Sequence, residues 1–144
     1  MINFKQSAFI NAPVEKVFKI IADPGQIPRW RNDVPAISGI SGETMKGSGF
    51  MEEVHFMGKK QLLMKVIEYV PDKRLVIEAQ GGMSLLPTQS FTFQAEDGRT
   101  RIDLEVTMKV SGIFVLMQFM LPGQLKKTWA KYFDNLNRLV KTNQ

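Results

Sequence analysis

The segment 100–110 alternates apolar and polar side chains without interruption, and this pattern constrains the fold more than any other in the chain. Apolar side chains occupy every second position, at Ile102, Leu104, Val106, Met108 and Val110. A period of two residues predicts a β-strand with one dry face and one solvated face. Such a strand needs neighbouring strands, and its dry face needs a second layer to cover it.

Further strand-like segments precede this one, and short turn signals separate them. Strands are predicted at 2–10, 34–42, 48–57, 60–70, 74–81, 88–96 and 100–110. The breaks between the later strands contain glycine or Pro-Asp, residues that favour turns. Short breaks join consecutive strands as antiparallel neighbours. The middle of the chain therefore predicts one antiparallel sheet.

Two short helices are predicted between the first strand and the second. Pro13 suits the first turn of a helix, because its missing N–H group would have no partner there in any case. Pro24 ends this helix, since a proline disfavours helical geometry at the residue before it. A turn or short second helix then carries the chain to Trp30. The first helix has an apolar face at helical spacing, formed by Val14, Val17, Phe18 and Ile21.

The end of the chain predicts one long amphipathic helix over 125–140. Its apolar stripe is formed by Leu125, Trp129, Tyr132, Leu136 and Leu139. Pro122-Gly123 comes just before it and predicts a kink or a new helix start. A long helix buries such a stripe by lying across the dry face of a curved sheet. We therefore expect a single α+β domain over residues 1–144, with about six or seven antiparallel strands wrapped around a C-terminal helix.

Composition excludes several classes of site. The chain has no cysteine and one histidine, His55, so it predicts no disulfide, no metal centre and no cofactor. The net charge is +5, but the basic residues are scattered, and we expect no nucleic-acid partner. The longest apolar run, 113–121, is too short to span a bilayer, and the first residues do not resemble a signal peptide. A cytoplasmic protein is expected.

Three segments together resemble the START-like superfamily, also called the polyketide cyclase/dehydrase and lipid-transport (SRPBCC) superfamily. They are INAPVEKVFKIIADPGQIPRW at 10–30, VIEYVPDKRLVIEAQGG at 66–82 and FTFQAEDGRTRIDLEV at 91–106. Their order and spacing cover nearly the whole chain. The resemblance implies a helix-grip fold, with a cavity between the sheet and the C-terminal helix. It does not imply one function, because the same fold carries binders, transporters and enzymes.

An apolar ligand in such a cavity would contact the inward-facing residues. The predicted ligand-binding residues are Trp30, Met51, Met64, Val66, Ile77, Phe91, Phe93, Leu104, Val106, Met108, Trp129 and Phe133. Trp30 is predicted either at the cavity rim or in the core. The neighbouring Arg29 and Arg31 are predicted as surface charges in preference to a site for an anionic head group.

His55 and Glu53 are the candidate catalytic residues. If Gly58-Lys59 forms a two-residue hairpin turn, Glu53 lies opposite Met64 and both His55 and Glu53 face the cavity. Glu68 is then either a further polar wall residue or a residue near solvent at the end of its strand, and the second position is the commoner one for a glutamate. A histidine beside a carboxylate suits general acid–base chemistry on a carbonyl substrate. A turn longer by one residue would reverse the face of every side chain.

The leading hypothesis is a protein that binds or carries a hydrophobic small molecule or lipid, because catalytic side chains are few. One alternative is a polyketide cyclase/dehydrase-like enzyme that uses His55 and Glu53. Another is an interaction module that uses the segment 113–121 for peripheral contact with a membrane or a protein. The sequence does not predict an oligomeric state.

Overall fold

The computed structural model describes residues 2–31, 33–40, 42–55, 58–82, 85–112, 115 and 120–142. These residues form one seven-stranded sheet in the order β1-β7-β6-β5-β4-β3-β2, and every neighbouring pair is antiparallel. The elements in chain order are β1 (Ile2–Ile10), α1 (Val14–Ala22), η1 (Pro24–Gln26), α2 (Ile27–Trp30), β2 (Ala36–Ser38), β3 (Gly49–His55), β4 (Lys59–Val70), β5 (Arg74–Gly81), β6 (Leu85–Glu96), β7 (Arg99–Val110) and α3 (Leu121–Thr142).

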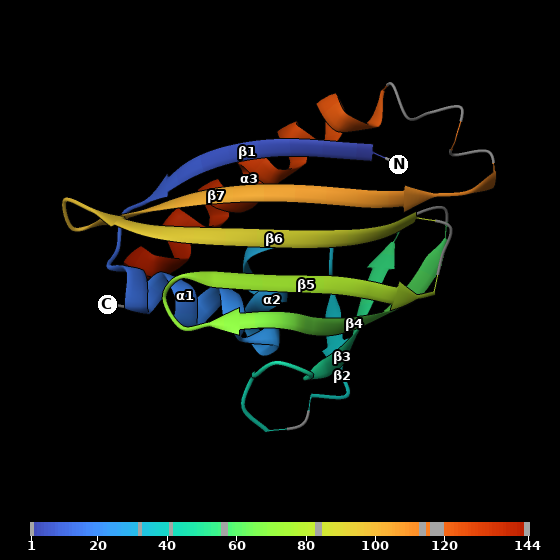
Figure 1. The fold of residues 1–144 in the computed structure, drawn as a ribbon, viewed down its shortest axis with the longest axis horizontal. Coiled ribbons are helices and arrows are strands. Elements are labelled where there is room, and N and C mark those ends of the chain that lie inside the picture. Colours follow the sequence, from blue (N-terminus) through green and yellow to red (C-terminus); the bar gives the residue numbers. More distant parts are fainter. Residues whose placement is uncertain are drawn as a thin grey trace.

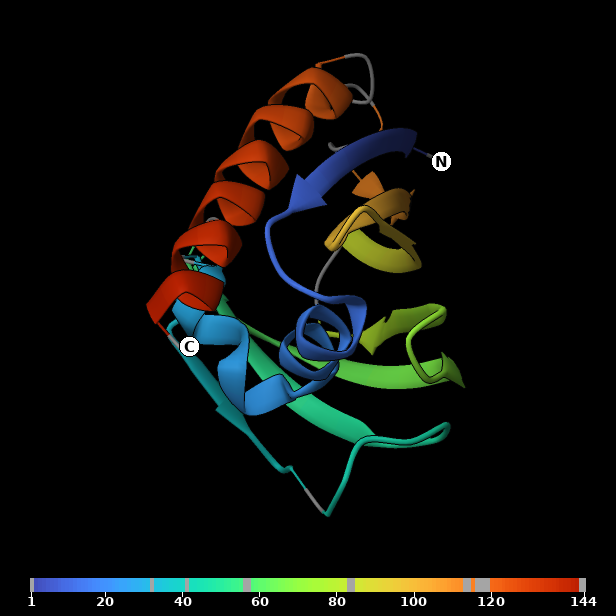
Figure 2. The same cartoon turned by 90° about the vertical axis from the view of Figure 1, so that its left-hand side faces the viewer.

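The sheet is strongly curved, and α1, α2 and α3 lie on its inner side (Figure 1, Figure 2). Figure 1 shows the strands in front with α1, α2 and α3 behind them. In Figure 2 the sheet bends around the two short helices, and α3 runs along the side that the sheet leaves open. The predicted α+β fold, a curved antiparallel sheet with a long C-terminal helix, is confirmed.

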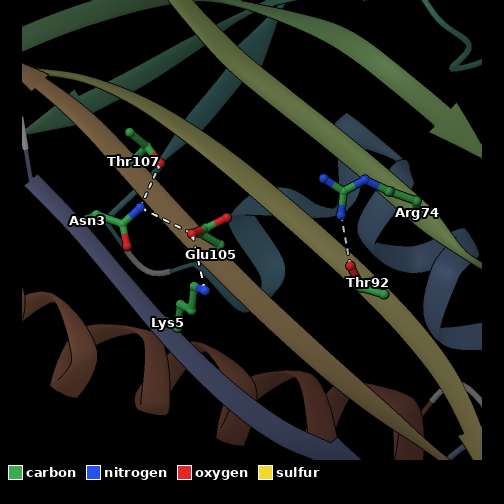
Figure 3. A network of polar contacts seen from close by, with 6 residues as sticks. All are labelled: Asn3, Lys5, Arg74, Thr92, Glu105 and Thr107. Carbon is green, nitrogen blue, oxygen red and sulfur yellow. Dashed lines mark hydrogen bonds and ion pairs between the residues drawn. The ribbon is translucent and has the colours of Figure 1, made fainter.

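The alternation predicted for the last strand is confirmed, and it separates the two faces of the sheet. Ile102, Leu104, Val106 and Met108 are buried on the inner face. The outer face carries polar contacts between strands, shown in Figure 3. There the Asn3 amide donates hydrogen bonds to the side chains of Glu105 and Thr107, each at 3.2 Å. Cross-strand pairs of this kind stabilise the solvated face of a sheet.

Helix α3 buries the predicted stripe against the inner face. Trp129, Tyr132, Phe133, Leu136, Leu139 and Val140 all belong to the apolar core. The helix begins at Leu121 rather than near 125, and Pro122 lies in its first turn, where a proline costs no hydrogen bond. The Pro-Gly pair therefore marks a helix start.

Asn137 joins the C-terminal part of α3 to the end of β1. Its side-chain oxygen accepts a hydrogen bond from the Asn11 backbone N–H at 2.8 Å, and its amide nitrogen donates to the Phe9 carbonyl at 3.1 Å. Close by, the buried Thr100 hydroxyl donates to the Ala12 carbonyl at 2.8 Å. These bonds satisfy backbone groups where the chain leaves the sheet for α1.

Two sequence predictions about the strands are wrong in detail. The strand expected over 34–42 is reduced to Ala36–Ser38. Between Val66 and Glu68, the pairing of β4 with β5 shifts register. A bulge changes which side chains face inward, and here Tyr69 packs against the core. Glu68 forms an ion pair with Arg74 at 3.0 Å and is not a polar wall residue of the interior.

The register of the β3–β4 hairpin also differs from the prediction. His55 pairs with Lys59, Glu53 with Gln61, and Glu52 with Leu62. The turn is longer than the two residues predicted, and the pairing of β3 with β4 is shifted by an odd number of residues. Every side chain of β3 therefore lies on the face opposite to the one predicted. Phe50, Glu52 and Val54 are buried, whereas the His55 side chain is 62% exposed.

Leu136 tests the packing of α3 on the sheet. It has no exposed surface and lies in the middle of the buried stripe. Leu136→Ala should lower the free energy of unfolding by about 2–5 kcal/mol, because it removes buried methyl groups and leaves a cavity. Chemical denaturation measures this change. Lys131→Ala, on the exposed side of the same helix, should alter it by no more than about 0.5 kcal/mol. Equal effects of the two changes would contradict the packing described here.

Candidate functional site

A cavity of about 140 Å³ lies between α3 and the inner face of the sheet. Most of its lining is apolar, and its polar residues come from β3, β6, α3 and the chain after α2. The lining residues are Arg31, Asp33, Glu52, Val54, Leu62, Leu85, Pro87, Gln89, Val106, Met108, Leu121, Leu125, Thr128, Trp129 and Tyr132. Asp33, Leu125 and Thr128 are also partly exposed to solvent, so this end of the cavity adjoins the surface.

A buried ion pair forms part of the cavity wall. The Arg31 guanidinium, with its side chain 8% exposed, lies 3.1 Å from a Glu52 carboxylate oxygen, and the Glu52 side chain is 2% exposed. The same guanidinium nitrogen lies 3.7 Å from the more exposed carboxylate of Asp33. Burial of a charge is costly unless an opposite charge accompanies it. Glu52 and Asp33 are the carboxylates that compensate Arg31 here.

Two aromatic rings of α3 hold the arginine in place. The guanidinium carbon lies 5.5 Å from the Trp129 ring centroid and 5.3 Å from that of Tyr132, which are cation–π distances. Burial by itself would lower the pKa of Arg31. The carboxylates of Glu52 and Asp33 raise it by more, so the pKa of Arg31 lies above its ordinary value. Burial also raises the pKa of Tyr132. Arg31 is therefore charged and the Tyr132 hydroxyl protonated at neutral pH.

Gln89 is the second unusual polar residue of the cavity. It lies on the inner face of β6, opposite Val106, and is 5% exposed. An amide side chain carries both hydrogen-bond donors and an acceptor. The side chain of Gln89 makes no hydrogen bond among the residues that the structure describes. This amide is free to bond with a molecule in the cavity.

The sequence was compared with families of known proteins. The model of a family described as polyketide cyclase / dehydrase and lipid transport matches residues 1–141. The chain belongs to this family. The resemblance to the START-like superfamily predicted from the three sequence segments is thereby confirmed. No curated protein matches this chain closely enough to count as a relative.

Solved structures share the fold of this family member at low sequence identity. A protein from Thermus thermophilus is 17% identical, with 99% of each chain covered and a TM-score of 0.82. A START superfamily protein from Mycobacterium smegmatis is 14% identical, with 99% of each chain covered and a TM-score of 0.76. A protein from Mesorhizobium loti is 18% identical, covers 99% of this chain and 98% of its own, and has a TM-score of 0.74. At such identities the likeness establishes the fold alone.

The predicted ligand-binding residues fall into three groups. Val106, Met108 and Trp129 line the cavity. Met51 lies on the outer face of the sheet, and the other eight are buried without lining the cavity: Trp30, Met64, Val66, Ile77, Phe91, Phe93, Leu104 and Phe133. Trp30 packs against Trp129 and Tyr132, with ring centroids 6.1 and 6.3 Å apart, and so lies in the core. Among the described residues, the cavity between the sheet and α3 lies towards the N-terminal end of the helix.

Three predicted site residues do not face the interior. Met51 pairs with Leu63, which is 47% exposed, on the outer face of the sheet. Glu53 and His55 lie on that outer face too, where Glu53 contacts Lys59 at 3.2 Å and His55 at 3.3 Å. The prediction that His55 and Glu53 face the cavity is wrong, and the reversed hairpin register is the reason.

Sequence reasoning missed Arg31, Glu52 and Gln89. Arg31 was expected at the surface, but it is buried beside Trp129. Glu52 carried a usable signal, because it stands between Phe50 and Val54 at a spacing of two residues. Two large apolar side chains in that register indicate the inner face. Gln89 lies in register with Phe91 and Phe93, which carries the same signal.

No group of three or more metal-binding side chains occurs in the part of the chain that the structure describes. Within the same ranges, no helix combines the length and hydrophobicity needed to cross a bilayer.

The Arg31–Glu52 pair makes a prediction about stability. Glu52→Leu should lower the free energy of unfolding by about 3–5 kcal/mol, because it leaves a buried arginine without its closest partner. The double change Arg31→Met with Glu52→Leu should recover most of this loss, since it removes both charges. Urea denaturation of the three proteins measures the difference.

Glu53→Gln provides the control for this pair, because its partners lie on the outer face. It should cost no more than about 1 kcal/mol, as expected for partly exposed ion pairs. A single Glu52→Leu variant as stable as the parent protein would show that the pair does not balance a buried charge.

Proposed function

We propose that the chain binds or carries a hydrophobic small molecule or lipid in the cavity between the sheet and α3. The observation that supports this most directly is the cavity itself, which is mainly apolar and has a few polar groups gathered around Arg31. Ligand sites in proteins have this composition. The family description, which includes lipid transport, agrees with such a role. We place the protein in the cytoplasm, in keeping with its lack of cysteine.

The volume of the cavity favours a small ligand over a long acyl chain. Its volume of about 140 Å³ is close to that of an engineered cavity, about 150 Å³, that binds benzene in another protein. Typical sites for larger ligands occupy about 300–1,000 Å³. A lipid would require the first turns of α3 to move outward, since Leu121, Leu125 and Thr128 form that wall. Acid–base chemistry by His55 and Glu53 is not part of this proposal, because both lie on the outer face.

Toluene is a suitable probe for the cavity. Native mass spectrometry of the purified protein should first identify any apolar molecule that is already bound. NMR titration of the ligand-free protein with toluene should then shift signals of residues around the cavity. Val106→Phe places extra atoms in this space and should weaken toluene binding about tenfold or more, because a filled cavity excludes the probe.

His55→Gln is the matched control for this titration. Its side chain lies outside, so toluene affinity should stay within about twofold of the parent protein. If toluene binds equally well to the parent and to Val106→Phe, it binds elsewhere, and the proposed site is wrong.

A second candidate function is peripheral contact with an anionic membrane. Only Val115, Met120 and Leu121 of the apolar segment 113–121 lie within the described residues. Val115 is 44% exposed and Met120 is 74% exposed, just before the first turn of α3. Lys126 and Lys127 are exposed on the same helix. Exposed apolar side chains beside lysines suit an interface with anionic lipid.

Met120→Asp tests the membrane candidate. The parent protein should sediment with vesicles that contain phosphatidylglycerol and less with pure phosphatidylcholine vesicles, because the lysines favour anionic lipid. Met120→Asp should reduce the bound fraction at least threefold, since it places a charge at the interface. Met45→Asp is the control, because Met45 is 58% exposed in the loop between β2 and β3. Equal losses in both variants would argue against this membrane face.

A further inference from the structure

Two carboxylates surround the single arginine that lines the cavity, so this cluster has more negative than positive charge. One guanidinium nitrogen of Arg31 lies 3.1 Å from Glu52 and 3.7 Å from Asp33. A ligand carboxylate placed beside Arg31 would lose its hydration and would lie close to two negative charges. A ligand ammonium group would lie close to the arginine. The surplus of carboxylates around Arg31 therefore disfavours an anionic ligand.

The side chain of Gln89 offers what a neutral polar ligand needs. It lies on the inner face of β6 and is almost wholly buried, with its amide unpartnered among the described residues. Its polar atoms are open to the cavity space, so water can bond to them when the cavity is empty, and a ligand hydroxyl or carbonyl group would replace that water. A hydroxyl or carbonyl group on the ligand is sufficient, because the amide both donates and accepts hydrogen bonds.

The walls of the cavity suit a single ring. Trp129 and Tyr132 both line it, and aromatic side chains pack well against the faces and edges of other rings. The volume of about 140 Å³ leaves space for one ring with small substituents. The size of the cavity, its surplus of carboxylates and the free amide restrict the ligand in three independent ways.

We propose that the cavity selects a compact ring compound that carries no anionic group and has one hydroxyl or carbonyl group that hydrogen-bonds to Gln89. This selectivity rests on the ligand-binding function proposed above and names the chemical class of the ligand. Gln89 determines the preference for a polar substituent, and the Arg31, Glu52 and Asp33 cluster rejects carboxylates.

Three probes that differ in one substituent test the selectivity: toluene, p-cresol and p-toluate. At pH 7 the phenol is neutral and the carboxylate is charged. The parent protein should bind p-cresol about three- to tenfold more tightly than toluene, the gain expected from one hydrogen bond. It should bind p-toluate at least about tenfold more weakly than p-cresol, because a buried carboxylate would lack a compensating charge. NMR titrations give the three dissociation constants.

Gln89→Leu should bind p-cresol no more tightly than toluene and should keep its affinity for toluene within about threefold. Thr88→Val is the matched control, since Thr88 precedes Gln89 on the same strand and pairs with Thr107 on the outer face. It should keep the preference for p-cresol. Circular dichroism checks the fold of each variant, and Gln89→Met replaces Gln89→Leu if the latter does not fold.

The possible results separate the two proposals. Equal binding of toluene and p-cresol to the parent protein would overturn the role of Gln89 but leave the ligand-binding function standing. Binding of p-toluate as tight as that of p-cresol would overturn the charge argument. A preference for p-cresol that survives in both Gln89 variants would also reject the proposed hydrogen bond. If none of the three probes binds, the ligand-binding function itself fails, and the selectivity with it.

Discussion

The packing of α3 against the inner face of the sheet is the constraint on which the other features depend. Its stripe includes Trp129, Phe133 and Leu136, which are at most 4% exposed. The sheet must curve to cover this stripe, because a flat sheet would leave the helix partly in water. The same curvature places α1 and α2 inside the bend (Figure 2) and sets the space available between helix and sheet.

The cavity and its ion pair are consequences of this geometry. Residues near the N-terminal end of α3 line the space of about 140 Å³ together with residues of β3, β6 and β7. Arg31 leaves α2 at this point and lies beside Trp129 and Tyr132. An arginine in such surroundings needs a carboxylate, and Glu52 supplies it at 3.1 Å. The result is an apolar site with a neutralised charged pair in its wall, which is suited to holding a small molecule.

The candidate site was harder to predict than the fold, and the β3–β4 hairpin shows why. Alternation in β7 was unambiguous, because five apolar residues recur at every second position. In β3 the two faces differ less in hydrophobicity. Glu52 shares one face with Phe50 and Val54, whereas Glu53 shares the other with Met51 and His55. The length of the turn decides the pairing register of the hairpin. An error of an odd number of residues in that register exchanges the two faces of the strand. His55 and Glu53 were therefore predicted inside, while Glu52 was overlooked.

Local patterns in the sequence determined the strands, the short helices, the C-terminal helix and the family to which the chain belongs. The helices and strands follow from periodicity, turn residues and helix-breaking prolines, which act over a few neighbouring residues. The family follows from the resemblance of three sequence segments and from the family model that matches residues 1–141. The tertiary structure alone decided that Arg31 and Glu52 meet and that Gln89 faces the same cavity. It also decided which of the predicted ligand contacts line this cavity, namely Val106, Met108 and Trp129. Such contacts depend on register, on the bulge in β4 and on how closely α3 approaches the sheet, and these distances arise only when separate elements pack together.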